Sequence, residues 1–503
     1  MNSCSDVIES DIIIIGAGIS GMSAAYYMLQ CEPTLDILIL EAERGRTLSV
    51  PLKTAQNTFR SFDLGGQFLT NDQPFIQSLV KSLNIDLEDE VREENNENII
   101  WDLDPDCSNC LQSSLSEFSN TTPWQHVLVF VDRIDHLCRN VQFSAPYASV
   151  EHHQFDLITI EEYITSYVPI PVSQNLIRNI IQTSCGLETS QMSLLFYLAY
   201  CNATGGMKNQ LMLNRSAFTW IKGGADQICS KIATLVGRQY IKTNRTVLNI
   251  TWDSCHVMIE TNDEIYCSQY AIVAIPPAAI LKINFTPAIT EKHLNVLKSV
   301  NSGHLLKFVV TYKKAFWRDH GYAGTILSCG ETSTMESRIH WCFDTTVRNC
   351  PALTGYLVYF ESRKSYKSEV LLQLAKYFGD FALNPIDYYE KNWVKEEHSS
   401  CFTTSPKLGD MKYFPTLKQP LGRLFWAGTE TANCWNGNME GAVQAGYRAA
   451  SEVLYYFRPQ TVLLHEIQTI NRSNSLYSTV VDFLLDWKTL TAMAVVAMFT
   501  LKK

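Results

Sequence analysis

The stretch Asp11-Ile12-Ile13-Ile14-Ile15-Gly16-Ala17-Gly18-Ile19-Ser20-Gly21 decides the fold of this chain. An acid followed by four isoleucines is typical of a buried parallel strand, and residues Met22 to Leu29 predict a helix. The first glycine allows a tight turn, the second lets the backbone approach a pyrophosphate, and the third lets helix and strand pack closely. The N-terminus of such a helix offers amide donors and a positive dipole end to a phosphate.

A second strand and an acid complete this unit. Residues Asp36 to Leu40 predict a strand that ends at Glu41, which lies 20 residues after Gly21. A carboxylate at that place can accept hydrogen bonds from ribose hydroxyls. A glycine turn without a ligand does not explain Glu41. Strand, helix, strand and acid together therefore predict dinucleotide binding.

Glycine-rich loops far along the chain favour FAD over NAD. Asp63-Leu64-Gly65-Gly66 and Gly428-Thr429-Glu430-Thr431 each supply backbone that a large cofactor can approach closely. Glu440 stands at the start of a helix predicted over Met439 to Tyr455, where a carboxylate fits the same arrangement. The chain therefore returns to the nucleotide-binding lobe near its end.

A chain of 503 residues is too long for one ordinary core, so several lobes are expected. Strand patterns appear at Thr243 to Thr251, Ala271 to Ile275 and Leu305 to Tyr312, while residues 126–200 are mostly helical in pattern. The predicted organisation is an FAD-binding lobe at 1–90, 221–285 and 396–458, a surface insertion at 91–125, a substrate lobe at 126–220 and 286–395, and a tail at 459–503.

Charge and cysteine content exclude other classes of function. The net charge of -10 argues against a nucleic-acid partner, which needs a basic surface. The 15 cysteines have no framework spacing, which favours free thiols in a reducing compartment. Cys107-Ser108-Asn109-Cys110 is a C-x-x-C without a second pair, so it is weak evidence for zinc. No metal site is predicted.

These motifs, together with Lys307, Phe316-Trp317-Arg318 and the segment from Trp393 to Thr404, resemble flavin-containing monoamine oxidases of the flavin amine oxidase family. The similarity runs over nearly the whole chain, although residues 91–125 align poorly. It implies an α/β fold with an FAD-binding Rossmann-like lobe of the glutathione-reductase type, a mixed α+β substrate lobe and a C-terminal helical tail. The implied reaction oxidises a small amine to an aldehyde and ammonia and reduces O2 to hydrogen peroxide.

The resemblance implies roles for two further side chains. Cys401 stands where monoamine oxidases carry a cysteine bonded to the flavin, so a thioether to FAD is expected there. Lys307 lies inside an apolar strand, where an unpaired ammonium is costly to bury. In the resembled family this lysine holds a water at flavin N5. A lysine at a strand edge, with its amine in water, is the alternative.

The resemblance also implies a set of cofactor contacts. These residues are Gly16, Ala17, Gly18, Ile19, Ser20, Gly21, Glu41, Ala42, Arg46, Gly65, Gly66, Val247, Trp393, Cys401, Glu430, Gly437, Met439 and Glu440. Near Arg46 the chain lacks about three residues of the usual glycine-pair segment. Ser399-Ser400 replaces two glycines, and the loop from Trp393 is one residue shorter than in the family.

The substrate side departs further from the family pattern. Two tyrosines usually frame the amine nitrogen, and this chain has Phe402 and Asn438 at the matching positions. Phe402 keeps an aromatic face, whereas Asn438 does not. Phe68 also replaces a tyrosine. The departures leave alternatives open, namely a polyamine oxidase, an L-amino-acid oxidase or a flavin-bound protein with low turnover.

The end of the chain suggests a membrane contact. Leu490 to Leu501 is apolar and precedes Lys502-Lys503, but it is shorter than the ~20 residues of a full span. Monoamine oxidases end in a helix that anchors them in the mitochondrial outer membrane. A tail anchor or interfacial helix there, facing the cytosol, is expected, and a helix packed on the protein, with a cytoplasmic location, is the alternative. Assembly into a homodimer is a further expectation.

Overall fold

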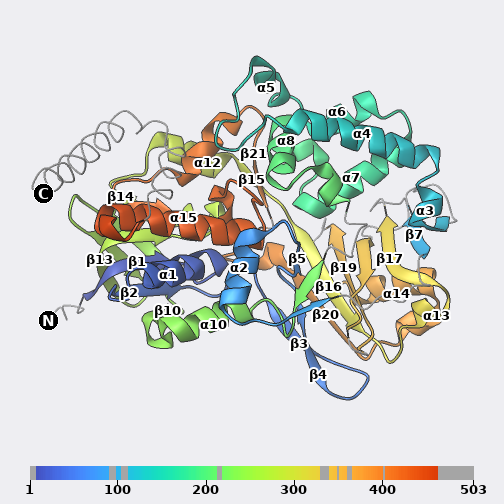
Figure 1. Cartoon of the computed structure of the whole chain (residues 1–503), viewed down its shortest axis with the longest axis horizontal. Helices are drawn as coiled ribbons and strands as arrows, with labels where there is room; N and C mark the ends of the chain where they lie inside the picture. Colours follow the sequence, from blue (N-terminus) through green and yellow to red (C-terminus); the bar gives the residue numbers. More distant parts are fainter. Residues whose placement is uncertain are drawn as a thin grey trace, which may run out of the picture.

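The computed structural model describes residues 7–89, 98–102, 111–211, 218–328, 339–347, 350–358, 365–399, 401 and 403–462. Figure 1 shows two large sheets beside each other, with a group of helices lying next to the second sheet. The predicted α/β class, with an FAD-binding Rossmann-like lobe and a mixed α+β second lobe, is confirmed. The lobe boundaries given above stay predictions.

The first sheet contains the predicted dinucleotide-binding unit. β1 (Ile8–Ile15) and β2 (Ile37–Glu41) are parallel neighbours joined by α1 (Ile19–Cys31). The run Ile12 to Ile14 is fully buried, as expected for a strand covered on both faces. The order of the sheet is β10 (Ile241–Thr243), β2, β1, β13 (Ile265–Val273), β12 (Val257–Thr261), β11 (Val247–Trp252) and β14 (Asn284–Thr286).

The late return of the chain to this lobe is confirmed. β22 (Leu424–Trp426) pairs in parallel with the end of β13, and α15 (Met439–Phe457) packs against α1. Figure 1 shows these two helices, far apart in the sequence, side by side. A Cβ at Gly446 would lie 2.3 Å from the Ser20 carbonyl oxygen. Glycine is therefore required for this close helix packing.

The strand predicted at Thr243 to Thr251 is in fact two strands, β10 and β11. The chain turns at Asn244, which has a φ of 57°. Asparagine tolerates this left-handed conformation better than most residues because its side chain is short and polar. The turn places the Arg245 amide against the Glu41 carbonyl oxygen, 2.9 Å away.

The second sheet is mostly antiparallel, with one parallel pair. Its order is β20 (Asp387–Asn392), β16 (Leu305–Thr311), β19 (Ala352–Val358), β18 (Ile339–Asp344), β17 (Tyr322–Ser328), β7 (Asn98–Asp102) and β8 (Leu111–Ser114). β7 and β17 are the parallel neighbours. α14 (Lys367–Phe378) packs its apolar side chains into the same core cluster as β16.

Part of the expected surface insertion belongs to the core instead. β7 and β8 are strands of the second sheet, Ile100 is fully buried, and the Trp101 ring stacks on Phe118 with centroids 3.8 Å apart. The sequence around this stretch is polar, so its pattern did not predict that the short apolar strand β7 pairs with the distant strand β17. Residues 90–97 and 103–110, including Cys107 and Cys110, lie outside the described residues.

The helical pattern of residues 126–200 is confirmed. Helices α4 (Thr122–Cys138), α7 (Pro171–Cys185) and α8 (Leu194–Ala203) pack on one another. The Asn179 amide of α7 donates to the carbonyl oxygens of Ser328 and His340, which joins these helices to the second sheet.

Further short elements lie along the chain between those described above. Those with helical character are α2 (Pro74–Ser82), α3 (Leu115–Phe118), α5 (Val150–Phe155), α6 (Ile160–Tyr167), α9 (Met207–Gln210), α10 (Gln227–Val236), α11 (Pro277–Ile280), α12 (Glu291–Ser299) and α13 (Phe316–Asp319). The short strands are β3 (Ser49–Lys53), β4 (Phe59–Asp63), β5 (Phe68–Leu69), β6 (Leu87–Asp89), β9 (Thr219–Ile221), β15 (Val300–Ser302) and β21 (Thr404–Pro406).

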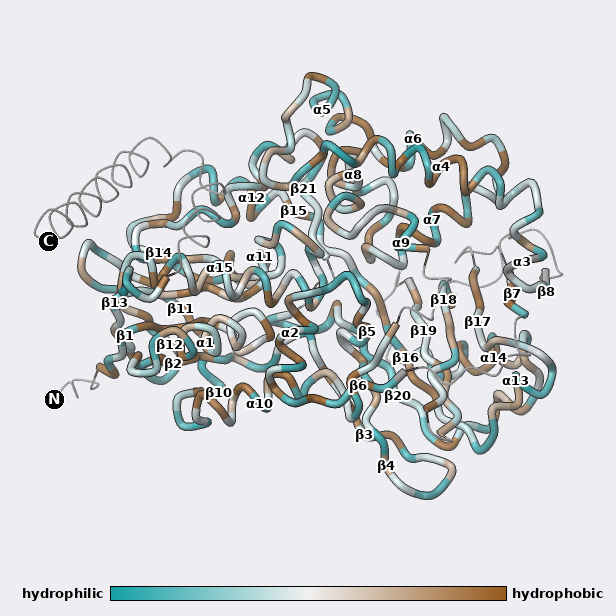
Figure 2. The backbone as a smooth tube through the Cα atoms, viewed as in Figure 1, coloured by the Kyte–Doolittle hydropathy of each residue, from teal (hydrophilic) through white to brown (hydrophobic). Residues whose placement is uncertain are grey.

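Hydrophobic residues concentrate on the interior strands, and polar residues on the outer turns (Figure 2). Among the helices that the structure describes, none is long and apolar enough to cross a bilayer. The tail segment Leu490 to Leu501 lies outside the described residues.

Candidate active site

A cavity of about 1190 Å³ runs from the first glycine turn to the second sheet. It is larger than the roughly 300–1,000 Å³ of an ordinary small-molecule site. The predicted site residues that line it are Gly16, Gly18, Ile19, Ser20, Glu41, Ala42, Arg46, Gly65, Gly66, Val247, Lys307, Trp393, Cys401, Gly437, Asn438 and Met439. The fold thus brings residues from the start, middle and end of the chain to one space.

Gly18 leaves open space beside the backbone at one end of this cavity. It is the N-cap of α1, and no side chain bonds to the free amides of the first turn. A Cβ at Gly18 would meet nothing closer than the Gly45 Cα atom at 3.7 Å, so this surface is free to receive a ligand. The buried Ser20 Oγ has no hydrogen-bond partner among the described residues. Open amides and an unpaired hydroxyl fit a pyrophosphate.

Glu41 lies beside the same turn, at the end of β2. Its carboxylate accepts hydrogen bonds from the Ala17 amide at 2.6 Å and from the Glu43 amide at 2.8 Å. Ala17 and Gly21 do not line the cavity. A Cβ at Gly21 would lie 2.0 Å from the Gly16 carbonyl oxygen, so Gly21 serves the close packing of helix and strand.

Lys307 is buried on β16 and points its amine at the Gly65-Gly66 loop. Nζ donates to the Gln67 side-chain oxygen at 2.6 Å and to the Gly65 carbonyl oxygen at 3.1 Å. Burial lowers the pKa of Lys307, and the nearby Asp63 carboxylate opposes that shift. The side chain is therefore not at a strand edge in water, and the partner that its burial requires is a pair of neutral oxygens.

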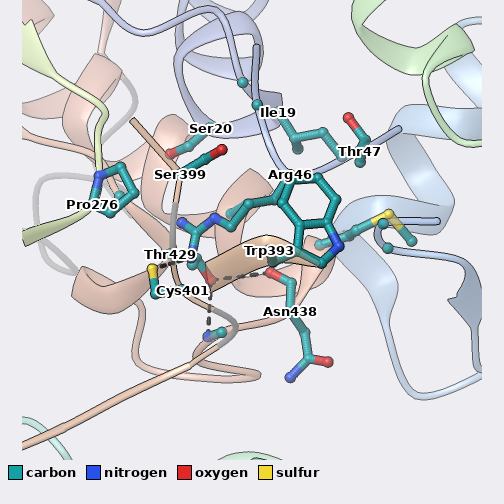
Figure 3. Close-up of a pocket in the computed structure, with 18 of the residues that line it drawn as sticks. Ile19, Ser20, Arg46, Thr47, Pro276, Trp393, Ser399, Cys401, Thr429 and Asn438 are labelled. Carbon is teal, nitrogen blue, oxygen red and sulfur yellow. Dashed lines mark hydrogen bonds between the residues drawn. The ribbon is translucent and has the colours of Figure 1, made fainter. Parts of the chain in front are cut away.

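Arg46, Cys401 and Glu430 form a buried cluster on the opposite wall. The guanidinium donates to Glu430 Oε1 at 2.8 Å and to Cys401 Sγ at 3.4 Å. Figure 3 shows Arg46 and Cys401 pointing toward each other. Burial raises the pKa of Cys401 to about 11, although Arg46 lowers it. Glu430 does not line the cavity and acts through Arg46.

Trp393 and Met439 shape the wall next to Gly65 and Gly66. The Trp393 indole nitrogen donates to the Leu64 carbonyl oxygen at 2.9 Å, and the Met439 side chain lies where a Cβ on Gly66 would fall. Gly437 has a φ of 82°, a conformation that favours glycine. Each contact fixes backbone at the edge of the cavity.

Glu440 is placed differently from the expectation. It does not line the cavity, and its carboxylate accepts hydrogen bonds from the Phe75 amide at 3.1 Å and the Ile76 amide at 2.7 Å. These are free amides at the start of α2, so Glu440 caps a neighbouring helix. Burial raises its pKa, and the two amides lower it.

The far end of the cavity is an aromatic chamber that the sequence did not reveal. Phe68 and Asn438 line it, and so do four residues missed from the sequence: Tyr200, Phe218, Trp341 and Tyr356. These aromatics come from four separate segments of the chain, and no local motif marks them. Phe402 lies outside the described residues.

Comparisons with known proteins agree with this arrangement. The family described as flavin containing amine oxidoreductase matches residues 19–454. Amine oxidase [flavin-containing] B of Sus scrofa is 32% identical over 464 residues, which cover 89% of this chain and 86% of that protein. The protein of the same name from Homo sapiens is 31% identical over 471 residues, with the same coverage.

Solved structures show the same fold. Cyclohexylamine oxidase from Brevibacterium oxydans IH-35A superposes with a TM-score of 0.80 at 24% identity, covering 89% of this chain and 99% of that one. Putrescine oxidase bound to putrescine gives a TM-score of 0.80 at 20% identity, covering 89% and 100%. The family match, the relatives and the cavity agree: this chain belongs to the flavin-containing amine oxidoreductases and is an enzyme that oxidises amines with a flavin.

Proposed function

We propose that this enzyme deaminates small primary or secondary monoamines, with O2 as the electron acceptor. The observation that carries the proposal is one continuous cavity that joins the glycine turn, Lys307 and Cys401 to the aromatic chamber. Aromatic walls suit the apolar body of a monoamine and can orient its nitrogen. When bound, FAD would supply the redox chemistry, in which the amine carbon loses a hydride equivalent and O2 is reduced to hydrogen peroxide.

The charges around the cavity favour a monoamine over an amino acid. An amino-acid site needs an arginine to hold the substrate carboxylate. The arginines among the described lining residues are Arg44, Arg46 and Arg245, and each already bonds to an acid. All three follow β2 or contact it, away from the aromatic chamber.

A polyamine site is also less well supported. Such a site needs carboxylates along the substrate path. Near the chamber, Asp72 is the one carboxylate among the described lining residues, and it is exposed. Thr70 donates to one of its oxygens at 2.5 Å and Asn209 to the other at 3.2 Å.

The described residues fit FAD in an extended position. Gly18, the free amides of α1 and Ser20 suit its pyrophosphate, and Glu41 suits a ribose. Lys307 would lie on the inner side of the flavin ring, where its amine could hold a water against Gln67 and Gly65. Trp393 and Gly66 would bound the same region.

We further propose that Cys401 is bonded to the flavin. Its position at the cavity beside Arg46 supports this, because the guanidinium favours the thiolate that must form the bond and so opposes the larger effect of burial. Acid precipitation of the parent protein should leave the yellow colour in the pellet, whereas the Cys401→Ala protein should release free flavin to the supernatant. Free flavin released from the parent would disprove the covalent bond.

The tail is proposed to hold the enzyme at a membrane, for which the mitochondrial outer membrane is the proposed site. Support comes from the apolar run Leu490 to Leu501 and the two lysines after it. Removing residues 484–503 should move the protein from the membrane fraction to the supernatant, and unchanged partitioning would reject an anchor. A homodimer is proposed as well, and sedimentation in detergent measures it.

The central test of the proposed function is peroxide release. Purified protein is supplied with benzylamine, tyramine or spermine, and hydrogen peroxide is measured in air. We expect turnover of at least one of the two monoamines and little with spermine. Peroxide from none of them would contradict amine oxidation by this protein.

A further inference from the structure

Asn438 places a free hydrogen-bond acceptor at the wall of the cavity. The residue is the N-cap of α15, but its side chain does not bond to the helix amides. Instead, Nδ2 donates to the Asn436 carbonyl oxygen at 3.2 Å, and the same side chain lies close enough to Tyr200 to lower the pKa of its phenol. The Asn436 carbonyl oxygen therefore takes one amide hydrogen, and no donor from the described residues reaches Oδ1.

Backbone carbonyls fix which way this amide faces. The Tyr200 phenol donates to the Ser184 carbonyl oxygen at 3.1 Å, and a carbonyl can only accept. The phenol thus directs its proton away from Asn438, and the Asn438 side chain lowers the pKa of that phenol, as an amide N–H near the phenol oxygen does. The Asn436 carbonyl oxygen requires Nδ2 on its own side. Reversing the amide would set Oδ1 against that carbonyl oxygen, so the orientation follows from the hydrogen-bond network.

The surroundings make this acceptor selective. Burial raises the pKa of Tyr200 well above its ordinary value, so the phenol keeps the proton that it donates to Ser184. The cavity that Asn438 lines also carries aromatic side chains, among them Phe218 and Trp341. A carbonyl oxygen that loses water in such surroundings without gaining a donor carries a penalty of about 1–3 kcal/mol.

We propose that Asn438 Oδ1 accepts a hydrogen bond from the substrate N–H group, and thereby selects primary and secondary amines against amines without an N–H. The proposal rests on the amine oxidation proposed above. It assigns Asn438 the role of a specificity residue, with Tyr200 as the residue that orients it. The nitrogen is held by a directional hydrogen bond from one side, in addition to contact with aromatic faces.

The experiment measures binding separately from turnover. The ligands are α,α-dimethylbenzylamine, which has no hydrogen on its α carbon to lose, and its N,N,N-trimethyl salt, which has no N–H. Both are cations at neutral pH, so charge is matched. Calorimetry on the flavin-loaded enzyme gives both affinities for the parent, Asn438→Leu and Tyr200→Phe.

We expect Asn438→Leu to weaken the primary amine about tenfold and the trimethyl salt less than about twofold, as loss of one hydrogen bond requires. Tyr200→Phe should give a smaller loss with the same selectivity, because the Asn436 carbonyl still holds Nδ2. Equal losses for both ligands, or none, in the two variants would overturn the inference. Circular dichroism and the content of bound flavin establish that each variant is folded before its two losses are compared.

Turnover separates this inference from the proposed function. In the parent, benzylamine should give a higher kcat/KM than N,N-dimethylbenzylamine at a pH where both are neutral, and Asn438→Leu should reduce that preference. No peroxide from any amine would contradict the proposed function, while the two binding constants would still decide the role of Asn438.

Discussion

At the residue scale, Gly16 and Gly18 lie in one turn but have opposite surroundings. A Cβ at Gly16 would fall 2.8 Å from the Ala274 carbonyl oxygen, and its φ of 103° strains any other residue. Gly18 has a φ of -67° and open space around its Cβ position. The fold itself therefore requires the first glycine, whereas the second has the open space that the proposed pyrophosphate contact needs.

This contrast gives a prediction for Gly18→Val. The variant should fold, yet its affinity for flavin should fall by at least about tenfold, or 1.4 kcal/mol, because the new side chain fills the space for the pyrophosphate. Flavin absorbance per folded protein measures the loss. Gly16→Ala is the comparison and should reduce stability first. A Gly18→Val protein with a full complement of flavin would place the phosphates elsewhere.

Lys307 allows a prediction about pH. Its pKa is lowered in the folded protein, so between that value and the ordinary lysine pKa of about 10.4 the unfolded chain binds the extra proton. Stability from this group therefore rises with pH across that window and is lowest below it. Relative to the parent, Lys307→Met should be favoured more at about pH 6 than at about pH 10. Urea unfolding of both proteins at each pH measures the difference between their free energies of unfolding. A difference that does not change with pH would contradict a buried amine with a lowered pKa.

At the element scale, the two ends of the chain are joined through α15. Its first turn carries Glu440, which caps α2, and its middle carries Gly446, which lets α1 approach. A helix from the end of the sequence thus holds two helices from the start. Sequence alone suggested a cofactor contact for Glu440, because its position near a helix start is common to both roles.

Glu440→Ala should lower the free energy of unfolding by about 1–2 kcal/mol, since two buried amides lose their acceptor. Glu440→Gln keeps one acceptor oxygen and should lose less. Chemical denaturation of both variants provides the measurement. The capping role would be wrong if alanine and glutamine had the same small effect.

At the scale of the whole molecule, the cavity is built from both large sheets and from residues between Ile15 and Ala442. A ligand that fills it links the two lobes and binds the folded state alone. In Cys401→Ala protein freed of flavin, added FAD at 100 times its Kd should stabilise folding by about 2.7 kcal/mol. Thermal unfolding at increasing FAD measures this. A midpoint of thermal unfolding that does not change with added FAD would mean that the cavity does not bind FAD.

The sequence by itself determined the nucleotide-binding unit and its location. The four isoleucines, the glycines and Glu41 act through nearest neighbours and fixed spacing, so β1, α1 and β2 were predictable from local pattern. The same holds for α15, whose motif is short and self-contained. The resemblance added Cys401 and Lys307 to these, and the structure places both at one cavity.

Only the tertiary structure decided the contacts that join distant segments. The chamber residues Tyr200, Phe218, Trp341 and Tyr356 have no spacing rule, because they come from elements that meet only after both lobes fold. β7 pairs with β17 more than 200 residues later in the chain, which no local polarity pattern can indicate. The orientation of the Asn438 amide depends on carbonyl oxygens at Ser184 and Asn436. Contacts of this kind depend on how distant segments pack together, and the periodicity of the sequence does not predict them.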